Sequence, residues 1–301
     1  MRAVLYDRFG DPRVLRIGET AEPSGACVVD VTAAALNPKD VLMRKGKFST
    51  FVRAPFPRLC GYDFAGQLDG REVFGMINGM LGRTCAERVA VDADELADRP
   101  SSLTAEEAAS IPLAGQTALQ ALRDDGGLER GQHAAINGAS GGVGTLAIQI
   151  AKALGARVTT ITSAKNRSLC TELGADEALA YDETDPLANL RDVDVFFDVF
   201  GNRSLADVRP CLARRATLVS TVPNPRVVLE VARTVLSKQR TKLVVVKSRR
   251  RDLETLAGWA EDGALKAIVD RTYAMEQIAD AHRHIESKRT RGKVVVRIRA
   301  E

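Results

Sequence analysis

The 301-residue sequence has no apolar run that approaches the roughly 20 residues of a membrane-spanning helix. Its first residues, MRAVLYDRFGDP, contain neither the apolar core nor the small-residue cleavage site of a signal peptide. We therefore expect a cytoplasmic protein. Hydrophobic residues make up 45% of the chain and charged residues 27%, enough apolar material for a sizeable core, which excludes disorder as the main state.

The sequence also lacks a strong excess of either charge. Its 43 Lys and Arg residues nearly balance 39 Asp and Glu residues, and the formal net charge is only +4. The one dense basic stretch, residues 238–251, lacks the interleaved aromatic side chains that stack on single-stranded bases. We therefore expect a solvated face there rather than a nucleic-acid site. Docking of an acidic carrier protein on this stretch is an open alternative.

Cysteine and histidine are scarce, which argues against a metal site. Five scattered cysteines without a Cys-x-x-Cys pair are typical of reduced cytosolic thiols, not of a disulfide framework or a structural zinc site. They are Cys27, Cys60, Cys85, Cys170 and Cys211. The three histidines are His133, His282 and His284, and the last two point in different directions if they lie on one helix. We expect no bound metal.

The first hundred residues alternate short apolar runs with Gly, Pro and Asp, a pattern typical of a twisted, mostly antiparallel sheet. The expected strands are Ala3–Tyr6, Cys27–Val31, Glu72–Met76 and Ala86–Val91. Leu68-Asp69-Gly70-Arg71 predicts a tight hairpin, because Asp-Gly supplies the positive φ angles of such a turn.

The pattern changes near residue 101. Thr104-Ala105-Glu106-Glu107 is a capping box that begins a helix. Strands then alternate with helices, which predicts a parallel sheet with helices on both faces. The expected strands are Ala134–Asn137, Val158–Thr162, Glu177–Tyr181, Val193–Val199, Ala216–Thr221 and Lys242–Lys247. The last fifty residues predict two helices and a strand, Lys293–Ile298, that returns to the first domain.

The strongest local motif is Gly138-Ala139-Ser140-Gly141-Gly142-Val143-Gly144, between an expected strand and an amphipathic helix that ends near Gly155. Glycines at such a turn allow close approach of a pyrophosphate, and the helix N-terminus supplies free amides and a positive dipole. Ala139 replaces the first glycine of the usual fingerprint. The flanking strands and helix favour a dinucleotide site, with a purely structural glycine turn as the alternative.

The end of the second strand indicates the type of dinucleotide. An NAD site carries an Asp or Glu there for the ribose 2′-hydroxyl. The sequence instead continues as Ser163-Ala164-Lys165-Asn166-Arg167, whose hydroxyl and cationic groups suit a 2′-phosphate. These residues favour NADP(H) over NAD(H), although a solvated helix start would have the same composition.

Six further motifs occur in order along the chain: Ala35–Asp40 (ALNPKD), Gly61–Gly66 (GYDFAG), Ala114–Leu119 (AGQTAL), Leu173–Asp176 (LGAD), Phe197–Gly201 (FDVFG) and Gly292–Val295 (GKVV). Together with the glycine loop, they resemble the zinc-free quinone oxidoreductase branch of the medium-chain dehydrogenases/reductases along the whole chain. Where zinc-dependent relatives carry a Cys and a Gly-His-Glu motif, this chain has Pro38/Lys39 and Gly61-Tyr62-Asp63.

The resemblance implies an α/β fold with two domains. A GroES-like, mostly-β substrate domain would comprise residues 1–113 and 248–301, and a Rossmann domain with a doubly wound parallel sheet would comprise residues 114–247. The implied activity is hydride transfer from NADPH, without zinc, to a quinone or to the β-carbon of an α,β-unsaturated carbonyl compound. An enoyl-thioester reductase that works with a carrier protein, and a non-catalytic nucleotide- or RNA-binding relative, are the alternatives.

The resemblance also implies a set of cofactor-binding residues. It assigns Asn37 and Thr117 to the nicotinamide end, and Phe200 and Gly201 to the passage of the adenosine. Lys293 would reach the cofactor from the closing strand. The pyrophosphate and the adenosine phosphate would be held by Ser140, Gly141, Gly142, Val143, Ser163, Lys165 and Tyr181.

Catalysis needs a hydrogen-bond donor at the substrate carbonyl, because negative charge develops on that oxygen. Asn37 and Tyr62 are the candidate donors, beside Thr117, while an Asn-Pro turn and a core tyrosine are the structural alternatives. Related enone reductases often have a lysine two residues after the Asp of Asn-Pro-x-Asp, and this chain has Leu42 there. A homodimer through the edge strand 242–247 is also expected, since family members commonly dimerise there.

Overall fold

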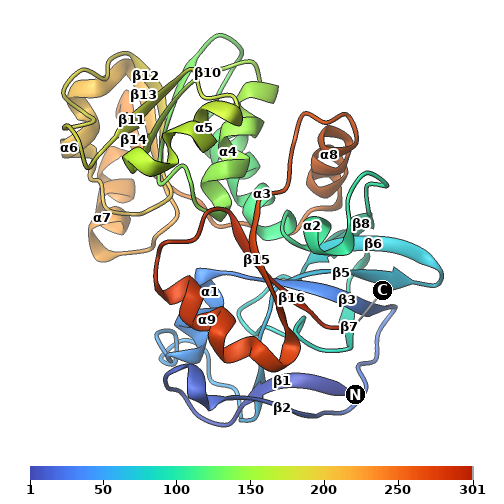
Figure 1. The fold of residues 1–301 in the computed structure, drawn as a ribbon. Coiled ribbons are helices and arrows are strands. Elements are labelled where there is room, and N and C mark those ends of the chain that lie inside the picture. Colours follow the sequence, from blue (N-terminus) through green and yellow to red (C-terminus); the bar gives the residue numbers. More distant parts are fainter. Residues whose placement is uncertain (300–301) are drawn as a thin grey trace. The chain divides into compact units, whose positions relative to one another are not determined.

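The computed structural model describes residues 1–299, and the chain forms two compact units (Figure 1). Unit 1 contains Met1–Gln116, Lys247–Gly263 and Ala267–Glu301. Unit 2 contains Thr117–Val246 and Ala264–Lys266. The first and last segments of the chain therefore belong to one unit, and the middle of the chain forms the other.

Unit 1 is built mainly from antiparallel strands. They are β1 (Arg2–Tyr6), β2 (Leu15–Glu19), β3 (Cys27–Leu36), β4 (Arg58–Leu59), β5 (Asp63–Leu68), β6 (Arg71–Met76), β7 (Arg88–Val91), β8 (Leu96–Asp98), β15 (Val269–Ala274) and β16 (Lys293–Arg297). A small sheet has the order β2-β1-β4. A larger sheet has the order β15-β16-β3-β5-β6-β8, with β7 paired to β3.

Short helices accompany these sheets. They are η1 (Pro12–Val14), α1 (Pro38–Arg44), η2 (Ala93–Glu95), α2 (Ala105–Ala109), α8 (Arg250–Glu261), η6 (Met275–Gln277) and α9 (Ile278–Glu286), while α3 (Pro112–Leu119) contains the boundary between the units. The expected capping box begins α2, where Thr104 Oγ1 accepts from the Glu107 amide and the Glu107 carboxylate accepts from the Thr104 amide.

Two features of unit 1 confirm the sequence analysis. The β5–β6 hairpin turns at Asp69 and Gly70, whose φ angles are 51° and 77°, the positive values that the Asp-Gly pair predicts. The closing strand β16 pairs antiparallel with β3 and so returns to the N-terminal segment. Strand β15, which pairs with β16 on its other side, was not predicted, because only Val269 and Tyr273 interrupt an otherwise polar or small sequence.

Unit 2 has a six-stranded parallel sheet. Its strands are β9 (His133–Asn137), β10 (Arg157–Thr162), β11 (Glu177–Ala180), β12 (Val193–Asp198), β13 (Leu212–Ser220) and β14 (Gln239–Leu243). Its helices are η3 (Gln120–Asp125), α4 (Gly142–Ala153), η4 (Ala164–Asn166), α5 (Arg167–Glu172), α6 (Leu205–Val208), η5 (Arg209–Cys211) and α7 (Pro225–Thr234). The strand order is β11-β10-β9-β12-β13-β14, and all neighbours are parallel.

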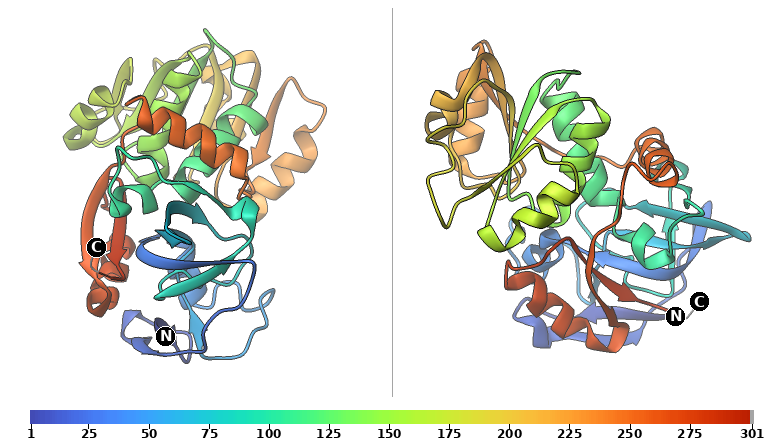
Figure 2. Two further views of the ribbon diagram at one scale, coloured as in Figure 1. Left: turned by 90° about the vertical axis from the view of Figure 1, so that its right-hand side faces the viewer. Right: turned by 45° about the horizontal axis from the view of Figure 1, so that its top comes forward.

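This order is that of a doubly wound Rossmann sheet, so the predicted fold class is confirmed. Helices α4 and α5 lie on one side of the sheet, and α6 and α7 lie on the other (Figures 1 and 2). The order reverses between β9 and β12, and ligands of such sheets bind outside the carboxyl ends of the strands at this switch point. The glycine motif begins directly after β9, at that edge.

One strand of unit 2 was predicted at the wrong place. The sequence analysis expected Lys242–Lys247, whereas β14 is Gln239–Leu243. The apolar run Val244–Val246 has the composition of a strand, which is why the strand was predicted there. In the structure the pairing with β13 ends at Leu243, and Val245 is exposed. Across residues 1–299, no helix combines the length and the apolar character needed to cross a membrane.

Candidate nucleotide-binding and active-site residues

The glycine motif forms a tight turn that opens towards solvent at one end. Gly138 has φ +84°. A Cβ on Gly144 would clash with the carbonyl oxygen of Gly138 and lie 2.6 Å from Ala139 Cα, so helix α4 can pack on strand β9 only with glycine there. A Cβ on Gly141 would meet only the Gly138 carbonyl oxygen, at 3.6 Å. The space beside Gly141 is therefore available to a ligand.

The first turn of α4 has free amides beside this space. Its N-cap is Gly141, and no side chain of the described residues caps the helix. Four amides at a helix N-terminus lack an intrahelical partner and, together with the helix dipole, they bind phosphates. Gly142 and Val143 are partly exposed. The four residues Ser140–Val143 therefore have the geometry of a pyrophosphate site.

Ser140 ties this turn to the next strand. Its Oγ accepts from Thr162 Oγ1 and from Asn166 Nδ2, both at 3.0 Å. Asn166 Oδ1 is buried and has no hydrogen-bond partner among residues 1–299. An unpaired buried acceptor is costly unless a ligand or water satisfies it. Its position beside Ser140 is a second sign that the site takes a hydrogen-bonding ligand.

The region predicted for the adenosine phosphate contains one free cation and one unexpected carboxylate. Lys165 is exposed, and none of the described carboxylates pairs with it, whereas Arg167 pairs with Glu183 at 2.8 Å. Asp182 Oδ1 accepts from the Ala164 amide at 2.8 Å. The sequence analysis missed Asp182 because it considered only the end of β10, whereas Asp182 follows the neighbouring strand β11. Ser163 is buried, and Tyr181 is exposed.

The loop after β12 is held by a buried carboxylate. Asp198 Oδ1 accepts from Asn137 Nδ2 at 2.7 Å and from the Gly201 amide at 2.9 Å, and Oδ2 accepts from the Arg203 amide at 2.8 Å. Burial raises the pKa of Asp198, although these donors partly offset the shift. The predicted residues Phe200 and Gly201 lie in this loop, and the Phe200 side chain is exposed. Asn137 and Asp198 were not predicted.

In unit 1, two predicted residues meet around an aspartate that was not predicted. Lys293 Nζ donates to Asn37 Oδ1 at 2.6 Å and to Asp63 Oδ2 at 2.9 Å. Asn37 Nδ2 donates to the same Asp63 oxygen at 2.9 Å. Asp63 Oδ1 accepts from the Leu113 amide at 2.6 Å. The cluster joins the ends of β3, β5 and β16, and all three side chains are buried.

Asp40 fixes the backbone next to this cluster. Its Oδ2 accepts from the Asn37 amide at 2.8 Å, and its Oδ1 accepts from the Gly61 amide at 2.7 Å. Burial raises the pKa of Asp40 to about 6, against the lowering effect of these two bonds. The predicted Asn-Pro-x-Asp turn is therefore real, and its carboxylate holds the β3–α1 junction to the start of the next motif.

Tyr62 and Lys39 form a stacked pair. The Tyr62 hydroxyl donates to the Met80 carbonyl at 2.5 Å, and burial raises the pKa of this tyrosine. Lys39 Nζ lies 3.9 Å from the centroid of the Tyr62 ring and donates to the Gly79 carbonyl at 2.7 Å. Burial lowers the pKa of Lys39. Lys39 was quoted in a motif but not predicted as a site residue.

The remaining predicted residue, Thr117, lies in α3 and is buried. It is the first residue of unit 2, whereas Asn37, Tyr62 and Lys293 belong to unit 1. Within residues 1–299, no group of three or more His, Cys, Asp or Glu side chains is arranged to hold a metal ion.

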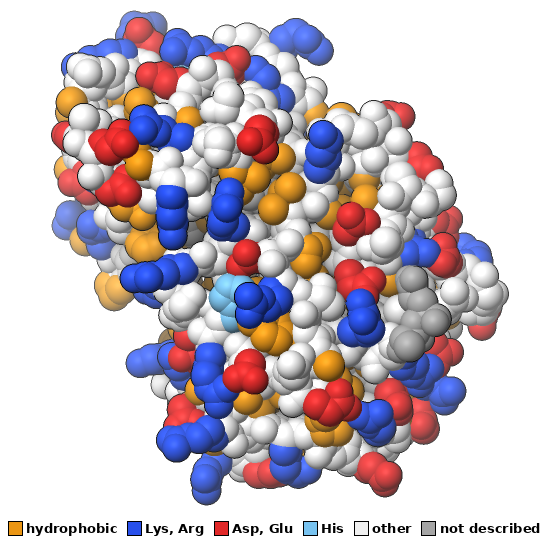
Figure 3. Space-filling model, in the orientation of Figure 1, with side chains coloured by type: hydrophobic (Ala, Val, Ile, Leu, Met, Phe, Trp, Pro, Cys, Tyr) orange, Lys and Arg blue, Asp and Glu red, His pale blue; other side chains and the backbone are white. Residues whose placement is uncertain are grey.

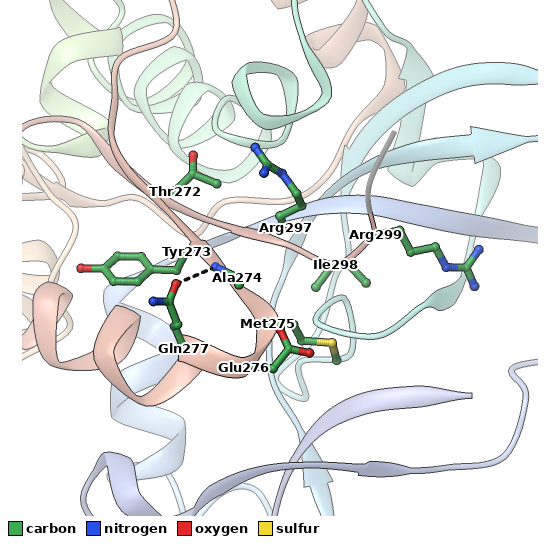
Figure 4. A pocket seen from close by; sticks show the side chains of 9 residues that line it. All are labelled: Thr272, Tyr273, Ala274, Met275, Glu276, Gln277, Arg297, Ile298 and Arg299. Atoms are coloured by element: carbon green, nitrogen blue, oxygen red, sulfur yellow. Dashed lines mark hydrogen bonds between the residues drawn. The ribbon is translucent and has the colours of Figure 1, made fainter.

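A surface hollow of about 430 Å³ in unit 1 involves none of the predicted residues (Figure 4). It is lined by β15, η6 and the end of β16, and the Gln277 side chain accepts from the Ala274 amide inside it. Its charged residues are already paired: Glu276 with Arg2, Arg297 with Glu106 and Arg299 with Asp30. The hollow therefore offers no free charged group to a ligand.

Charges of both signs are interspersed on the visible face of the molecule (Figure 3).

Comparison with known proteins gives consistent similarities along the whole chain. The family described as zinc-binding dehydrogenase matches residues 173–296. A mitochondrial NAD(P)H oxidoreductase of Danio rerio is 30% identical, covering 99% of this chain and 91% of its own length. A 2-methylene-furan-3-one reductase of Solanum lycopersicum is 31% identical, over 98% and 79%. The solved quinone oxidoreductase of Coxiella burnetii is 30% identical, covers 99% of both chains and has a TM-score of 0.88.

Proposed function

Because the chain belongs to the zinc-binding dehydrogenase family of medium-chain dehydrogenases/reductases, we propose that it is an NADPH-dependent reductase of quinones or α,β-unsaturated carbonyl compounds. Its similarity to an NAD(P)H oxidoreductase and to a quinone oxidoreductase supports this activity. The observation that carries the proposal is the uncapped start of α4 beside Gly141, with the unpaired Asn166 Oδ1 next to it.

These residues fit a dinucleotide. The amides and hydroxyl of Ser140–Val143 would hold the pyrophosphate, and Ser163, Lys165 and Tyr181 would hold the adenosine phosphate, with Phe200 and Gly201 flanking the adenosine. When bound, the reduced dinucleotide supplies a hydride. The chain's own residues bind it, orient it and exclude water. Asn37 and Thr117 are the proposed residues of the nicotinamide end, and Lys293 is a proposed cofactor contact from the closing strand.

The proposed reaction needs no zinc. The positions that the resemblance aligns with the metal ligands of zinc-dependent relatives hold Pro38, Lys39 and Gly61–Asp63. The Tyr62 hydroxyl is engaged with a backbone carbonyl, and Asp63 is engaged with Lys293. We expect reduction of an enone or a quinone to continue in the presence of a strong chelator, and a loss of activity that zinc restores would contradict the proposal.

The preference for NADPH depends on the balance between Lys165 and Asp182. Lys165 offers a free ammonium to a 2′-phosphate, while Asp182 occupies the Ala164 amide with a negative charge. The absence of a carboxylate at the end of β10 supports NADPH. We therefore expect NADPH to bind more tightly than NADH.

The first experiment is a fluorescence titration of the purified protein with NADPH and NADH. Lys165→Ala should weaken NADPH binding about 10- to 100-fold, since a charge-assisted hydrogen bond contributes about 1.5–3 kcal/mol, and should leave NADH binding nearly unchanged. Lys238→Ala, which removes another exposed lysine of unit 2, is the matched control. Failure to bind either nucleotide would overturn the proposed function, and equal losses for both would overturn the NADPH preference.

The same proposal includes a cytoplasmic homodimer. The edge strand β14 supports it, because among the described strands β14 pairs only with β13. The D. rerio relative carries a mitochondrial name, so the cytoplasmic location stays a prediction.

A further inference from the structure

The reaction proposed above needs a hydrogen-bond donor for the substrate oxygen, and the two predicted donors are already occupied. Asn37 is buried, and its Nδ2 donates to Asp63 and to the Ala35 carbonyl. Tyr62 is only 1% exposed, and its hydroxyl donates to Met80. A donor that is satisfied inside the protein would have to break a buried hydrogen bond to reach a substrate, at the full desolvation cost of its partner.

The Lys293 ammonium is also engaged inside the protein. It donates to Asn37 and forms an ion pair with the fully buried Asp63. Removing this cation would leave a buried carboxylate without its counter-charge, which is strongly destabilising. Lys293 therefore holds the cluster together and is not available as a mobile donor.

Lys39 is the exception in this part of unit 1. Its ammonium has three N–H groups, and it donates one hydrogen bond, to the Gly79 carbonyl. Among the described residues, no carboxylate lies within ion-pair distance of Lys39. The residue is partly exposed, and its Nζ lies over the Tyr62 ring. The ammonium is therefore held in one direction and still has N–H groups to offer.

The spacing along helix α1 explains why Lys39 can replace the lysine that the resemblance expects at position 42. The resemblance expects an amine at position 42, where this chain has Leu42. Lys39 is three residues earlier on the same short helix, α1, and residues three apart lie on the same helix face. Three exposed apolar side chains lie close to Lys39 in the sequence or to its acceptor loop. Leu42 is on α1 with Lys39, and Met80 and Leu81 directly follow Gly79, whose carbonyl accepts from Lys39. The Met80 carbonyl accepts from the Tyr62 hydroxyl.

We propose that Lys39 is a catalytic residue that donates a hydrogen bond, and then a proton, to the carbonyl oxygen of a neutral, apolar enone or quinone. This inference rests on the proposed function and deepens it. It assigns to Lys39 the role for which Asn37 and Tyr62 were the predicted candidates.

The chemistry balances with groups that the proposed function supplies. A hydride adds to the β-carbon of the enone, and the electron pair of the C=C bond moves so that the charge ends on the carbonyl oxygen. Lys39 transfers one proton to that oxygen and becomes a neutral amine. The resulting enol takes its keto form by gaining a proton at carbon and losing the one on oxygen to water, and the amine regains its proton from water. A quinone takes one hydride and two protons overall to become a hydroquinone.

The environment of Lys39 suits this transfer. Burial lowers its pKa from that of an ordinary lysine, while the negative charges of Asp40 and Asp63 partly oppose the shift. A lysine that loses its proton more easily is a better proton donor near neutral pH, provided that it is still protonated there. Rates should consequently fall at alkaline pH as Lys39 becomes neutral.

The test compares Lys39→Gln, Lys39→Arg and the control Lys47→Gln, which removes an exposed lysine shortly after α1. Removal of one donor to a developing oxyanion lowers kcat about 10²- to 10³-fold. We expect this loss in Lys39→Gln, together with loss of the alkaline limb of the kcat profile. Lys39→Arg should recover part of the rate without that limb. NADPH binding and thermal unfolding should match those of the wild type and of Lys47→Gln.

Two results would overturn the inference in different ways. If Lys39→Gln keeps a kcat within about threefold of the wild type and the same alkaline limb, Lys39 is not the donor, although the proposed function stands. If the wild type binds NADPH but reduces no enone or quinone, the proposed function fails, and the role of Lys39 fails with it. A direct NMR titration of Lys39 in the free protein after isotopic methylation, assigned with Lys39→Arg, should show the same pKa as the alkaline limb of the kcat/KM profile.

Discussion

At the scale of single residues, His282 of unit 1 has a strongly displaced protonation equilibrium. This residue lies in α9 and is fully buried. Its Nδ1 accepts from Arg44 Nε at 3.4 Å, and its Nε2 has no hydrogen-bond partner in the described part of the chain. Burial, and secondarily the charge of Arg44, lowers the pKa of His282 to about 3. Arg44 is itself buried, pairs with Glu286 and donates to the Gly10 carbonyl. The imidazole is therefore held neutral.

This histidine makes the stability of the fold depend on pH. The folded pKa lies below the unfolded value of about 6.5, so the unfolded chain binds a proton first as the pH falls. The contribution is fully present above about pH 6.5 and decreases below it by up to about 1.4 kcal/mol per pH unit. His282→Gln should remove most of this slope between pH 6.5 and 5 in urea unfolding.

The difference in unfolding free energy between His282→Gln and the wild type separates the pH dependence due to His282 from that due to Asp40. Because the pKa of Asp40 is raised to about 6, its contribution has the opposite sign and decreases as the pH rises from about 4 to 6. That slope is present in both proteins and cancels in the difference. Unfolding at pH 8 measures the cost of the lost Arg44 contact alone. An unchanged difference between pH 8 and pH 5 would contradict the neutral, buried state of His282.

The sequence identified some residues of the candidate site but not how they combine. Asn37 and Lys293, 256 positions apart, could be named from motifs, while Asp63 between them was quoted only as part of a motif. Lys39 was not identified as a site residue, because its acceptor is the Gly79 carbonyl and the course of that loop does not follow from residue types. Asp182 was missed because it follows β11, whereas the prediction considered only the residues after β10. The two strands are parallel neighbours, so the residues after them meet in the folded structure although they are distant in the sequence.

At the scale of elements, the turn between β9 and α4 separates a packing role from a binding role. Gly144→Ala should destabilise the fold by about 1–3 kcal/mol, since its Cβ would collide with the backbone of Gly138 and Ala139. Gly141→Ala should leave stability nearly unchanged, because φ is −83° and the nearest atom is 3.6 Å away. Its methyl group would nevertheless occupy the side on which the pyrophosphate is proposed to lie.

Thermal unfolding and NADPH titration of both variants measure these two roles. We expect Gly141→Ala to unfold like the wild type and to bind NADPH at least tenfold more weakly, about 1.4 kcal/mol. We expect Gly144→Ala to unfold at a clearly lower temperature. Unaltered nucleotide affinity in Gly141→Ala would contradict the proposed phosphate site.

Element prediction succeeded where sequence and burial agreed. Strand β10 is rich in β-branched residues and was predicted within one residue, and the terminal strand β16 within one residue as well. Helix α4 was predicted from one apolar face, but Thr145, Ile148 and Gln149 are buried too, and Gln149 bonds to the backbone of Lys266. Periodicity shows the apolar face of a helix and gives no signal for a polar residue that is buried by its hydrogen bonds.

At the scale of the whole molecule, the exposed apolar residues of unit 2 bear on the predicted homodimer. Leu236 is 97% exposed and Val235 64% exposed in the connection between α7 and β14, and Val228 and Leu229 are exposed on α7. Apolar residues gathered beside an unpaired strand edge favour association.

Sedimentation velocity at micromolar protein should therefore show a dimer. Leu236→Asp should shift the distribution towards the monomer, because a charge would be buried at the interface. Phe51→Asp, which changes an exposed aromatic residue of unit 1, is the control. A monomeric wild type would contradict the prediction.

The return of β16 to β3 has a consequence for biosynthesis. Nearly all of unit 2 precedes α8 in the chain, so a ribosome delivers it before the final strand of unit 1 exists. Until residues 293–297 emerge, β3 has an open edge where β16 will pair, and Asp63 lacks the ammonium of Lys293. Unit 1 therefore cannot complete its larger sheet or the ion pair of Asp63 until residues 293–297 have been synthesised, although its first strands are made at the start of translation.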